Sequence, residues 1–314
     1  MLISVVLSTR DRANQLSRTM QSLATIVIPE GCTCELLVVD NASSDATSAV
    51  IAMAKLSNMT LRPLYEPRIG QSHARNLGVT EARGEVIVFT DDDLYHSADW
   101  LDQITRPLRR GEAEAVTGAM RLAPHLERDW MLPLHHSLLA APLRNTPAAA
   151  ELIGANMAIL RQVLSRVPWF DTELGPGALG FGDDTLFGMQ VREAGYRIAT
   201  VPLGTEHHFL PERLTRASFL SHATKLGKSA AYTSHHWEHK SQKMARVNFY
   251  RKIVQLAAWR RSHPSETRKL EGMHLSEIHH LRSLHLYGQA LIERCRPRNY
   301  ERYGLLKLIG NNDV

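Results

Sequence analysis

The chain has 314 residues, 44% of them hydrophobic and 22% charged, a balance typical of a globular protein with a conventional core. No tract rich in proline, glycine and serine and no internal repeat is present, which disfavours disordered and solenoid architectures. The net charge of +5 is unevenly spread, because residues 211–314 carry 19 lysines and arginines against 8 acidic residues, whereas residues 1–210 carry 18 against 24. The C-terminal part is therefore expected either to meet an anionic surface or to present a well-solvated helical surface.

The cysteine content and the apolar runs indicate where the protein resides. Cys32, Cys34 and Cys295 make an odd number and lack the paired spacing of a zinc site, so a reduced, cytoplasmic protein is expected. A strand predicted at the very start of the chain leaves no room for a secretory signal. No apolar stretch reaches the roughly 18 residues of a membrane-spanning helix. Peripheral attachment at the inner membrane face is left open.

The N-terminal half alternates apolar, β-branched runs with segments of helical spacing. We expect strands at 2–8, 35–39, 61–65 and 86–90, and helices at 13–24, from Ser44 with Asp45 in its first turn, and at 70–82. Strands that alternate with helices predict a parallel sheet of the doubly wound α/β type.

Polar clusters follow three of these strands, at 8–12, 40–45 and 91–93. In open parallel sheets, ligands bind beyond the carboxyl ends of the strands, so these loops are expected to converge on one site. No glycine-rich dinucleotide fingerprint and no phosphate-binding loop motif is present, which disfavours a dinucleotide-binding or kinase-like protein.

Two carboxylate motifs are candidates for the chemistry. FTDDD at 89–93 ends a buried strand in three adjacent carboxylates, which a hard divalent cation would neutralise. The aspartates of GALGFGDDTLF at 177–187, Asp183 and Asp184, open a predicted helix that runs to Ala194, where a carboxylate can take a proton from a hydroxyl nucleophile. Each motif also has a purely structural explanation. The aspartates of the first can be solvated or cap a helix, and those of the second can interact favourably with the helix dipole.

Histidines and arginines supply further candidates. His207 and His208 follow Glu206 after a predicted strand at 196–202, and imidazole serves as metal ligand or base, although either can be an ordinary surface or core residue. Arg68 and Arg75 flank a glycine-containing turn. They can contact a diphosphate or the carboxylates of the site, or form surface ion pairs.

The second half of the chain differs in character. Helices with mixed apolar and basic faces are expected at 218–232, 242–261 and 265–294, and the domain boundary is placed so that residues 1–210 form one domain and 211–314 a helical region. Residues 122–150, rich in proline and histidine, are expected to form a long loop or lid.

In order and spacing, these motifs resemble family 2 glycosyltransferases of the inverting, DxD-containing bacterial type. The resemblance spans about residues 2–215 and rests on SVVLSTRDR at 4–12, VVDNASSDAT at 38–47, GQSHARNLG at 70–78, FTDDD at 89–93 and GFGDDTLFGMQVREAGYRI at 180–198. It implies an α/β GT-A nucleotide-diphospho-sugar transferase fold, a doubly wound mixed sheet, here followed by a C-terminal helical extension.

The resemblance also implies residue roles. Asp184 corresponds to the catalytic base, and Asp183 stands where the family has a glutamate, a departure that bears on how the sugars are held. A divalent Mn²⁺ or Mg²⁺ ion would be bound by Asp93, with Asp91 and either His207 or His208. The residues implied for nucleotide-sugar binding are Ser8, Thr9, Arg10, Asp40, Arg68, Arg75, Asp91 and Asp92.

The function implied is transfer of a sugar from a nucleoside diphosphate, UDP foremost, to a glycan, glycolipid or small-molecule hydroxyl in bacterial polysaccharide, glycolipid or natural-product assembly. One alternative is a sugar nucleotidyltransferase, although STRDR at 8–12 lacks the glycines expected after its first strand. Another is a nucleotide- or carbohydrate-binding protein without turnover. Nucleic-acid binding is not expected, since the basic C-terminal region matches no known module. That region is a candidate for membrane contact or homodimer formation.

Overall fold

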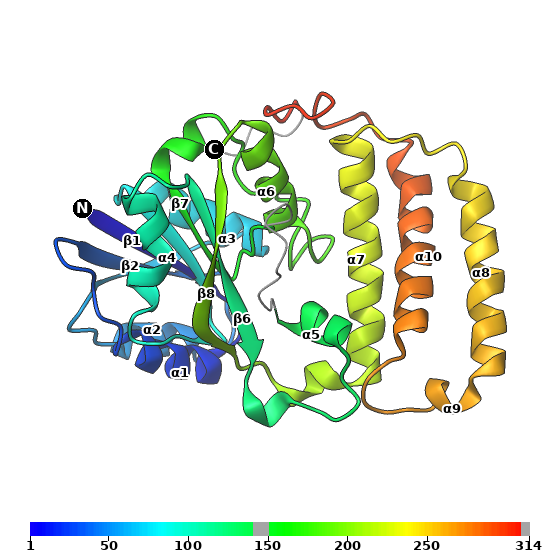
Figure 1. Cartoon of the computed structure of the whole chain (residues 1–314), viewed down its shortest axis with the longest axis horizontal. Helices are drawn as coiled ribbons and strands as arrows, with labels where there is room; N and C mark the ends of the chain where they lie inside the picture. Colours follow the sequence, from blue (N-terminus) through cyan, green and yellow to red (C-terminus); the bar gives the residue numbers. More distant parts are fainter. Residues whose placement is uncertain (141–150, 309–314) are drawn as a thin grey trace. The chain divides into compact units, whose positions relative to one another are not determined.

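The computed structural model describes residues 1–140 and 151–308, and its chain forms two compact units. The larger unit comprises Met1–Glu127, His136–Thr172 and Asp183–Phe209, and the second comprises Arg128–His135, Glu173–Gly182 and the chain from Leu210 onward. The first contains the sheet and the second the long C-terminal helices (Figure 1).

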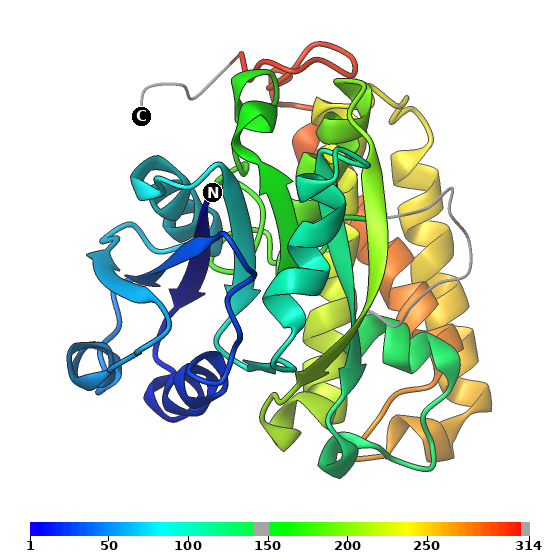
Figure 2. The same cartoon turned by 60° about the vertical axis from the view of Figure 1, so that its left-hand side comes forward.

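The larger unit is built on one mixed sheet with the strand order β3-β2-β1-β4-β7-β6-β8-β5. Figures 1 and 2 show this sheet from two directions. Its strands are β1 (Leu2–Thr9), β2 (Thr33–Asp40), β3 (Thr60–Tyr65), β4 (Val86–Asp91), β5 (Leu94–Tyr95), β6 (Ala115–Leu122), β7 (Asn156–Leu160) and β8 (Ile198–His207).

The register of the first four strands decides where the site lies. Strand β1 runs parallel to both β2 and β4, with Thr9 opposite Asp40 and Ser8 opposite Asp91. Because the three strands end at the same level, the loops that follow them leave the sheet together. Strand β3 in turn runs parallel to β2, which confirms the prediction that the strands at 2–8, 35–39, 61–65 and 86–90 form a parallel set.

The other half of the sheet brings in a distant segment. Strand β7 is antiparallel to β4 and β6, whereas β8 runs parallel to β6 and antiparallel to the short β5. The pairing of β5 with β8 places His207 opposite Leu94. The end of β8 therefore lies beside the residues that follow the triple aspartate.

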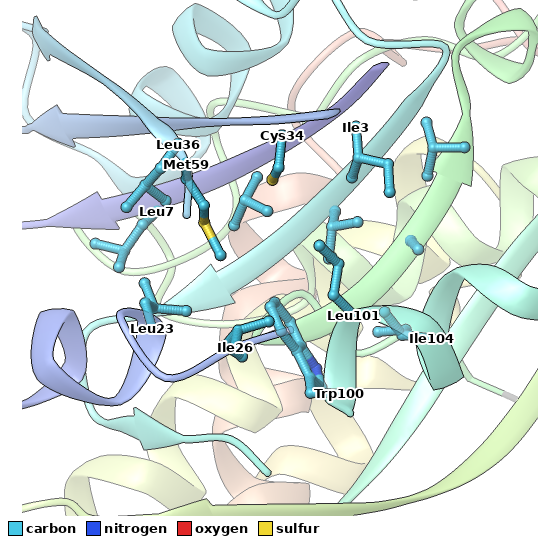
Figure 3. Packing of buried hydrophobic residues seen from close by; sticks show 14 of the residues in the cluster. Ile3, Leu7, Leu23, Ile26, Cys34, Leu36, Met59, Trp100, Leu101 and Ile104 are labelled. Atoms are coloured by element: carbon cyan, nitrogen blue, oxygen red, sulfur yellow. The ribbon is translucent and has the colours of Figure 1, made fainter. Parts of the chain in front are cut away.

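Helices of the larger unit cover the sheet, and apolar side chains fill the space between them. One buried cluster contains Leu7 and Leu36 of the sheet together with Leu23, Ile26 and Trp100 (Figure 3). The helices are α1 (Ala13–Leu23), α2 (Thr47–Met53), α3 (Gln71–Glu81), α4 (Trp100–Arg109) and α6 (Asp183–Glu193), with 3-10 turns η1 (Pro124–Leu126) and η3 (Arg161–Ser165).

The second unit consists mainly of helices: η4 (Pro211–Leu214), α7 (Arg216–His236), α8 (Ala245–Ser262), α9 (Pro264–Thr267) and α10 (Leu275–Glu293). Helix α10 lies between α7 and α8 and packs on both (Figure 1). Gly227 of α7 permits the close approach to α10, since a Cβ atom there would stand 2.3 Å from the Arg282 carbonyl oxygen. In the described part of the chain, no helix combines the length and apolarity that a bilayer crossing requires.

Several element boundaries differ from the sequence predictions. Helix α2 begins at Thr47 rather than near Ser44, because the Asp45 carboxylate accepts the backbone N–H groups of Ala13 and Thr47 and so belongs to the turn before the helix. The strand expected at 196–202 instead runs from Ile198 to His207, which makes Glu206 and His207 strand residues.

The helix expected at 265–294 is broken into α9 and α10. Gly272 in the intervening turn has φ of 71°, in the left-handed region, which favours glycine and ends helical geometry. The long loop expected at 122–150 instead contains η1 and a short helix, α5 (Pro133–Leu139). Its part from 141 to 150 lies outside the described residues.

Candidate active site

The candidate site lies at the carboxyl ends of β1, β2 and β4, where buried polar side chains replace the apolar runs. Thr9, Asp40 and Asp92 are each no more than 5% exposed. The Asp40 carboxylate accepts a hydrogen bond from the backbone N–H of Ser43 at 3.0 Å, which closes the loop after β2. A carboxylate held this way is a fixed acceptor for a ligand group.

A single arginine neutralises two of the three adjacent aspartates. Arg12 donates from Nη1 to Asp92 at 2.9 Å and to Asp93 at 2.7 Å, while Thr9 donates its hydroxyl proton to Asp92 at 2.7 Å. Burial would lower the pKa of Arg12, but the two carboxylates raise it above its ordinary value. Burial likewise raises the pKa of Asp92, although Arg12 opposes that rise.

A second arginine joins the two acidic motifs. Arg75 of α3 donates from Nη1 to Asp183 at 2.6 Å and reaches Asp91 with Nη2 at 3.3 Å. Asp91 also accepts a hydrogen bond from Gln71 at 3.0 Å. The guanidinium is buried and lies 5.5 Å from the ring centroid of Phe170. Burial raises the pKa of both Asp91 and Asp183, and Arg75 counteracts it in each case.

The chain makes room for this arginine with a glycine. A Cβ atom on Gly154 would stand 2.5 Å from Nη1 of Arg75 and 2.7 Å from its Cζ. The backbone N–H of Gly154 also donates to Asp184 at 2.9 Å. Gly154, two residues before β7, therefore lies against Arg75 and also donates a hydrogen bond to the second acidic motif.

The two aspartates of that motif have different environments. Asp183 is 3% exposed and is engaged by Arg75. Asp184 is half-buried and accepts hydrogen bonds from the backbone N–H groups of Gly154 at 2.9 Å and Thr185 at 2.7 Å, and from the Thr185 hydroxyl at 3.4 Å. Asp184 is thus the member of the pair with a partly open carboxylate and a fixed orientation.

The two neighbouring histidines also differ. Nδ1 of His207 lies 2.7 Å from the Leu139 carbonyl oxygen, and because a carbonyl only accepts, Nδ1 carries a proton. Nε2 then faces Asp93 at 3.3 Å. His208 instead directs Nε2 to Glu206 at 3.0 Å and stacks on Tyr95 with centroids 3.8 Å apart.

The side chains near Asp93 supply some, but not all, of the ligands that a divalent cation needs. Among the residues that the structure describes, no group of three or more His, Cys, Asp or Glu side chains is placed to hold a metal ion. The chain nevertheless presents a carboxylate oxygen and an imidazole nitrogen 3.3 Å apart, and the backing of Nδ1 by a carbonyl is the usual support of a metal-binding histidine. One or two protein ligands suffice where diphosphate oxygens and water complete the shell.

The remaining sequence candidates lie around these contacts. Ser8 is buried at the end of β1, Arg10 pairs with Asp11 with 37% of its side chain exposed, and Arg68 pairs with Glu66 at 3.0 Å.

Three residues at the site were not nominated from the sequence: Arg12, Gln71 and Gly154. Arg12 lies in STRDR, in the loop after β1, and Gln71 opens α3 in GQSHARNLG. Their places in these two motifs were the available signal. Gly154 precedes an unpredicted strand, so no local pattern identified it.

Comparisons with known proteins agree with this geometry. The chain is 28% identical over 214 residues to the succinoglycan biosynthesis protein ExoM of Rhizobium meliloti, an alignment that covers 67% of this chain and 68% of that protein. It is 28% identical over 200 residues to glucosyl-3-phosphoglycerate synthase of Mycolicibacterium paratuberculosis, covering 55% and 58% respectively.

Solved structures share the architecture at low identity. The mannosyltransferase PcManGT from Pyrobaculum calidifontis, in complex with GDP-Man and Mn²⁺, matches with a TM-score of 0.55 and 20% identity over 73% of this chain and 61% of that one. Residues 1–349 of S. aureus TarS with UDP match with a TM-score of 0.51 and 16% identity over 94% and 90%. These likenesses show the fold.

The mixed sheet and the carboxylates beyond its parallel strands define a GT-A nucleotide-sugar transferase fold. The family model for glycosyl transferase family 2 matches residues 4–167, more than half of the chain. The protein belongs to this family and is a glycosyltransferase.

Proposed function

We propose that this enzyme transfers a sugar from a nucleoside diphosphate to an acceptor hydroxyl with inversion at the anomeric carbon, in bacterial polysaccharide, glycolipid or natural-product assembly. The observation that carries the proposal is the Arg75 bridge, which holds Asp91 of the first acidic motif and Asp183 of the second against one buried guanidinium. This bridge supports a shared role for the two acidic motifs, the first proposed to lie toward the diphosphate and the second to contain the base.

Asp184 is the proposed base. Its carboxylate takes the proton of the acceptor hydroxyl as that oxygen attacks the anomeric carbon, and the bond to the diphosphate breaks on the opposite face. The backbone N–H groups of Gly154 and Thr185 orient it. Asp183, bonded to Arg75, is a positioning residue in this scheme, so its shorter side chain relative to the family glutamate affects alignment rather than proton transfer.

Donor binding is proposed at the loops after the parallel strands. Ser8, Thr9, Arg10, Asp40 and Arg68 surround the nucleoside end, while Asp91 and Asp92 lie toward the diphosphate. The contact of Arg12 with two aspartates supports a role for this residue as well. UDP is the proposed nucleotide, and the complexes of relatives with UDP or GDP-Man support a nucleoside diphosphate donor.

Asp93 and His207 are proposed to hold Mn²⁺ or Mg²⁺, with Asp91 close by. When bound, the ion would stabilise the negative charge of the diphosphate as a Lewis acid. The opposed Asp93 and His207 atoms support this choice over His208, whose ring nitrogen bonds to Glu206. The Mn²⁺ in the PcManGT complex is consistent with such an ion.

The proposed setting is the cytoplasm, supported by three cysteines that are all free. A glycan, glycolipid or small molecule is the proposed acceptor. Homodimer formation through residues 211–314 stays a prediction, for which the basic helices of that region are the candidate surface.

The test is titration calorimetry of the full chain with UDP, GDP and dTDP, each with Mn²⁺ and with EDTA, followed by turnover assays on the sugar conjugate of the nucleotide that binds. We expect one diphosphate to bind in a metal-dependent manner, and Asp93→Ala to lose that binding. Asp184→Asn should bind normally but lower sugar transfer by at least about 100-fold, as expected for a general base.

Asp99→Asn, an exposed aspartate at the start of α4, is the matched control and should behave as the wild type. The anomeric configuration of the product, read by nuclear magnetic resonance, distinguishes inversion from retention. Failure of every nucleotide to bind, or full activity in Asp184→Asn, would overturn the proposal.

A further inference from the structure

Helix α8 presents an unusual surface in the second unit. Within α8, which the structure describes throughout, only Ala245 and Leu256 are buried. Val247, Tyr250 and Val254 are 56%, 58% and 67% exposed. A helix of the second unit therefore buries a narrow edge against its neighbours and leaves large apolar side chains in water.

These exposed residues form one continuous face. The spacing of three or four residues places them on the same side of the helix, and the residues are Val247, Tyr250, Arg251, Val254, Ala258 and Arg261, all exposed. We call this set the α8 outer face. Leu256 lies on the opposite side, and α8 packs on α10 (Figure 1). The α8 outer face thus mixes aliphatic, aromatic and cationic side chains.

The charge around this face is of one sign. No acidic residue occurs between Glu238 and Glu266, while seven lysines and arginines do: Lys240, Lys243, Arg246, Arg251, Lys252, Arg260 and Arg261. Of these, Arg260 is paired with Glu277. The segment has no carboxylate of its own to neutralise Arg251 and Arg261, so an anionic partner would be attracted to it.

We propose that the α8 outer face docks the protein onto an anionic lipid surface. The valines would enter the boundary between headgroups and acyl chains, Tyr250 would sit at that boundary as aromatic side chains do, and Arg251 and Arg261 would contact lipid phosphates. Basic residues near an anionic bilayer each contribute roughly a fivefold gain in partitioning.

A second copy of this chain fits the face less well. In a two-fold symmetric pair the same patch meets itself, so the arginines of one α8 would approach those of the other without an intervening carboxylate. A lipid surface supplies the negative charge that this arrangement lacks. The inference does not depend on the donor chemistry of the proposed function.

The experiment is flotation of the full chain with vesicles of phosphatidylcholine alone and of phosphatidylcholine mixed with phosphatidylglycerol. We expect binding to the mixed vesicles, weakened by salt. Arg251→Gln/Arg261→Gln should lower partitioning about 30-fold, the product of two lost cations, and Val247→Ser/Val254→Ser should lower it by at least about tenfold.

Lys55→Gln/Arg110→Gln is the matched control, because it removes two exposed cations from the larger unit with the same change in net charge. It should bind mixed vesicles as the wild type does. Circular dichroism and nucleotide calorimetry on each variant show whether the fold and donor site persist. Light scattering coupled to gel filtration reports the oligomeric state.

Absence of vesicle binding by the wild type would overturn the proposal, as would unchanged binding in both α8 variants. Equal losses of vesicle binding in the control and the arginine variant would mean that net charge alone causes the binding, and would also overturn the proposal. A dimer that Val247→Ser/Val254→Ser dissociates, without vesicle binding by the wild type, would identify a second copy as the occupant.

Discussion

Arg12 supplies the positive charge that two buried aspartates of the site require. Asp92 and Asp93 have side chains 6% and 4% exposed, while that of Arg12 is 38% exposed. Removing one partner of a buried pair is costly because the other charge stays buried. The partial exposure of Arg12 lowers that cost, since water screens the pair.

We therefore expect Arg12→Gln to lower the free energy of unfolding by about 1–3 kcal/mol at neutral pH, measured by urea denaturation. Arg10→Gln is the matched control, because Arg10 lies two residues away and forms an ion pair with the exposed Asp11. It should change stability by less than about 0.5 kcal/mol. Equal effects of the two substitutions would contradict the assignment of Arg12 as the counter-charge.

His207 and His208 offer a second comparison between neighbours. Only His207 presents Nε2 to Asp93, and imidazole is a better ligand for transition ions than for Mg²⁺. His207→Ala should weaken nucleotide binding at least about tenfold in Mn²⁺ and less in Mg²⁺, measured by calorimetry. His208→Ala should leave both affinities near those of the wild type. The reverse pattern would assign the ligand to His208.

The choice between Arg10 and Arg12 shows what residue-level sequence analysis lacks. Both arginines stand in one loop motif, and nothing in the letters STRDR distinguishes them. Asp11 between them has φ of 51°, in the left-handed region, and the Asp11 carboxylate accepts from Ser44 of the next loop. This turn, made by a long-range contact, decides which arginine meets the aspartates.

At the scale of elements, a buried hydrogen bond to a carboxylate joins α7 to α10 in the second unit. His236 of α7 accepts the backbone N–H of Asn299 at Nδ1, so the proton is on Nε2, which donates to Glu293 of α10 at 3.0 Å. Burial would raise the pKa of Glu293. Hydrogen bonds from His236 and Gln289 and the charge of Arg296 outweigh burial and lower that pKa to about 2.

The sign of the pH effect follows from this lowered pKa. Glu293 titrates in the unfolded chain near its ordinary 4.5, so its contribution is complete above that pH and is lost as pH falls toward 2. We expect the wild type to lose roughly 2–3 kcal/mol more stability than Glu293→Gln between pH 5.5 and about 2.5, measured by urea denaturation followed by circular dichroism.

Glu301→Gln, an exposed carboxylate in the same terminal segment, is the control and should retain the pH dependence of the wild type. Parallel pH profiles for the wild type and Glu293→Gln would show that the contact contributes no such linkage. That outcome would mean that apolar packing alone holds α7 against α10.

The predictability of elements follows their burial. The first four strands were identifiable because they are apolar, β-branched and, for β1, β2 and β4, buried over nearly their whole length. Strands β6 and β7 carry AVTGAMRL and NMAIL, whose alanine and methionine content fits helix as well as strand. These segments are strands because β7 pairs with β6 and with β4, and such long-range pairing cannot be predicted from a local sequence pattern.

At the scale of the whole molecule, the family, the fold class and the order of motifs were accessible from sequence, since the acidic motifs follow strands as the fold requires. The contact of Arg75 with both acidic motifs was not accessible from sequence. It requires the space left by Gly154 and a carboxylate, Asp183, from a helix distant in the chain. Sequence showed three separate candidates, Arg75, Asp91 and Asp183, and the fold makes them one buried network.

A sugar nucleotidyltransferase and a glycosyltransferase differ in the bond that the whole site breaks. Nucleotidyl transfer requires a nucleoside triphosphate and a sugar phosphate and releases pyrophosphate, whereas sugar transfer releases a nucleoside diphosphate. The loop after β1 has no glycine to bring backbone N–H groups against a triphosphate, and it directs Arg12 onto Asp92 and Asp93 instead.

We therefore expect the wild type to release UDP, or the nucleotide identified by calorimetry, slowly from its sugar conjugate even with water as acceptor, and to release no pyrophosphate from any triphosphate and sugar 1-phosphate pair. Coupled assays for diphosphate and for pyrophosphate measure both products. Asp184→Asn should abolish the first signal without creating the second, because the proposed base acts on an acceptor hydroxyl. Pyrophosphate release by the wild type would assign the carboxylates to nucleotidyl transfer, and silence in both assays despite nucleotide binding would favour a binding protein of the same fold.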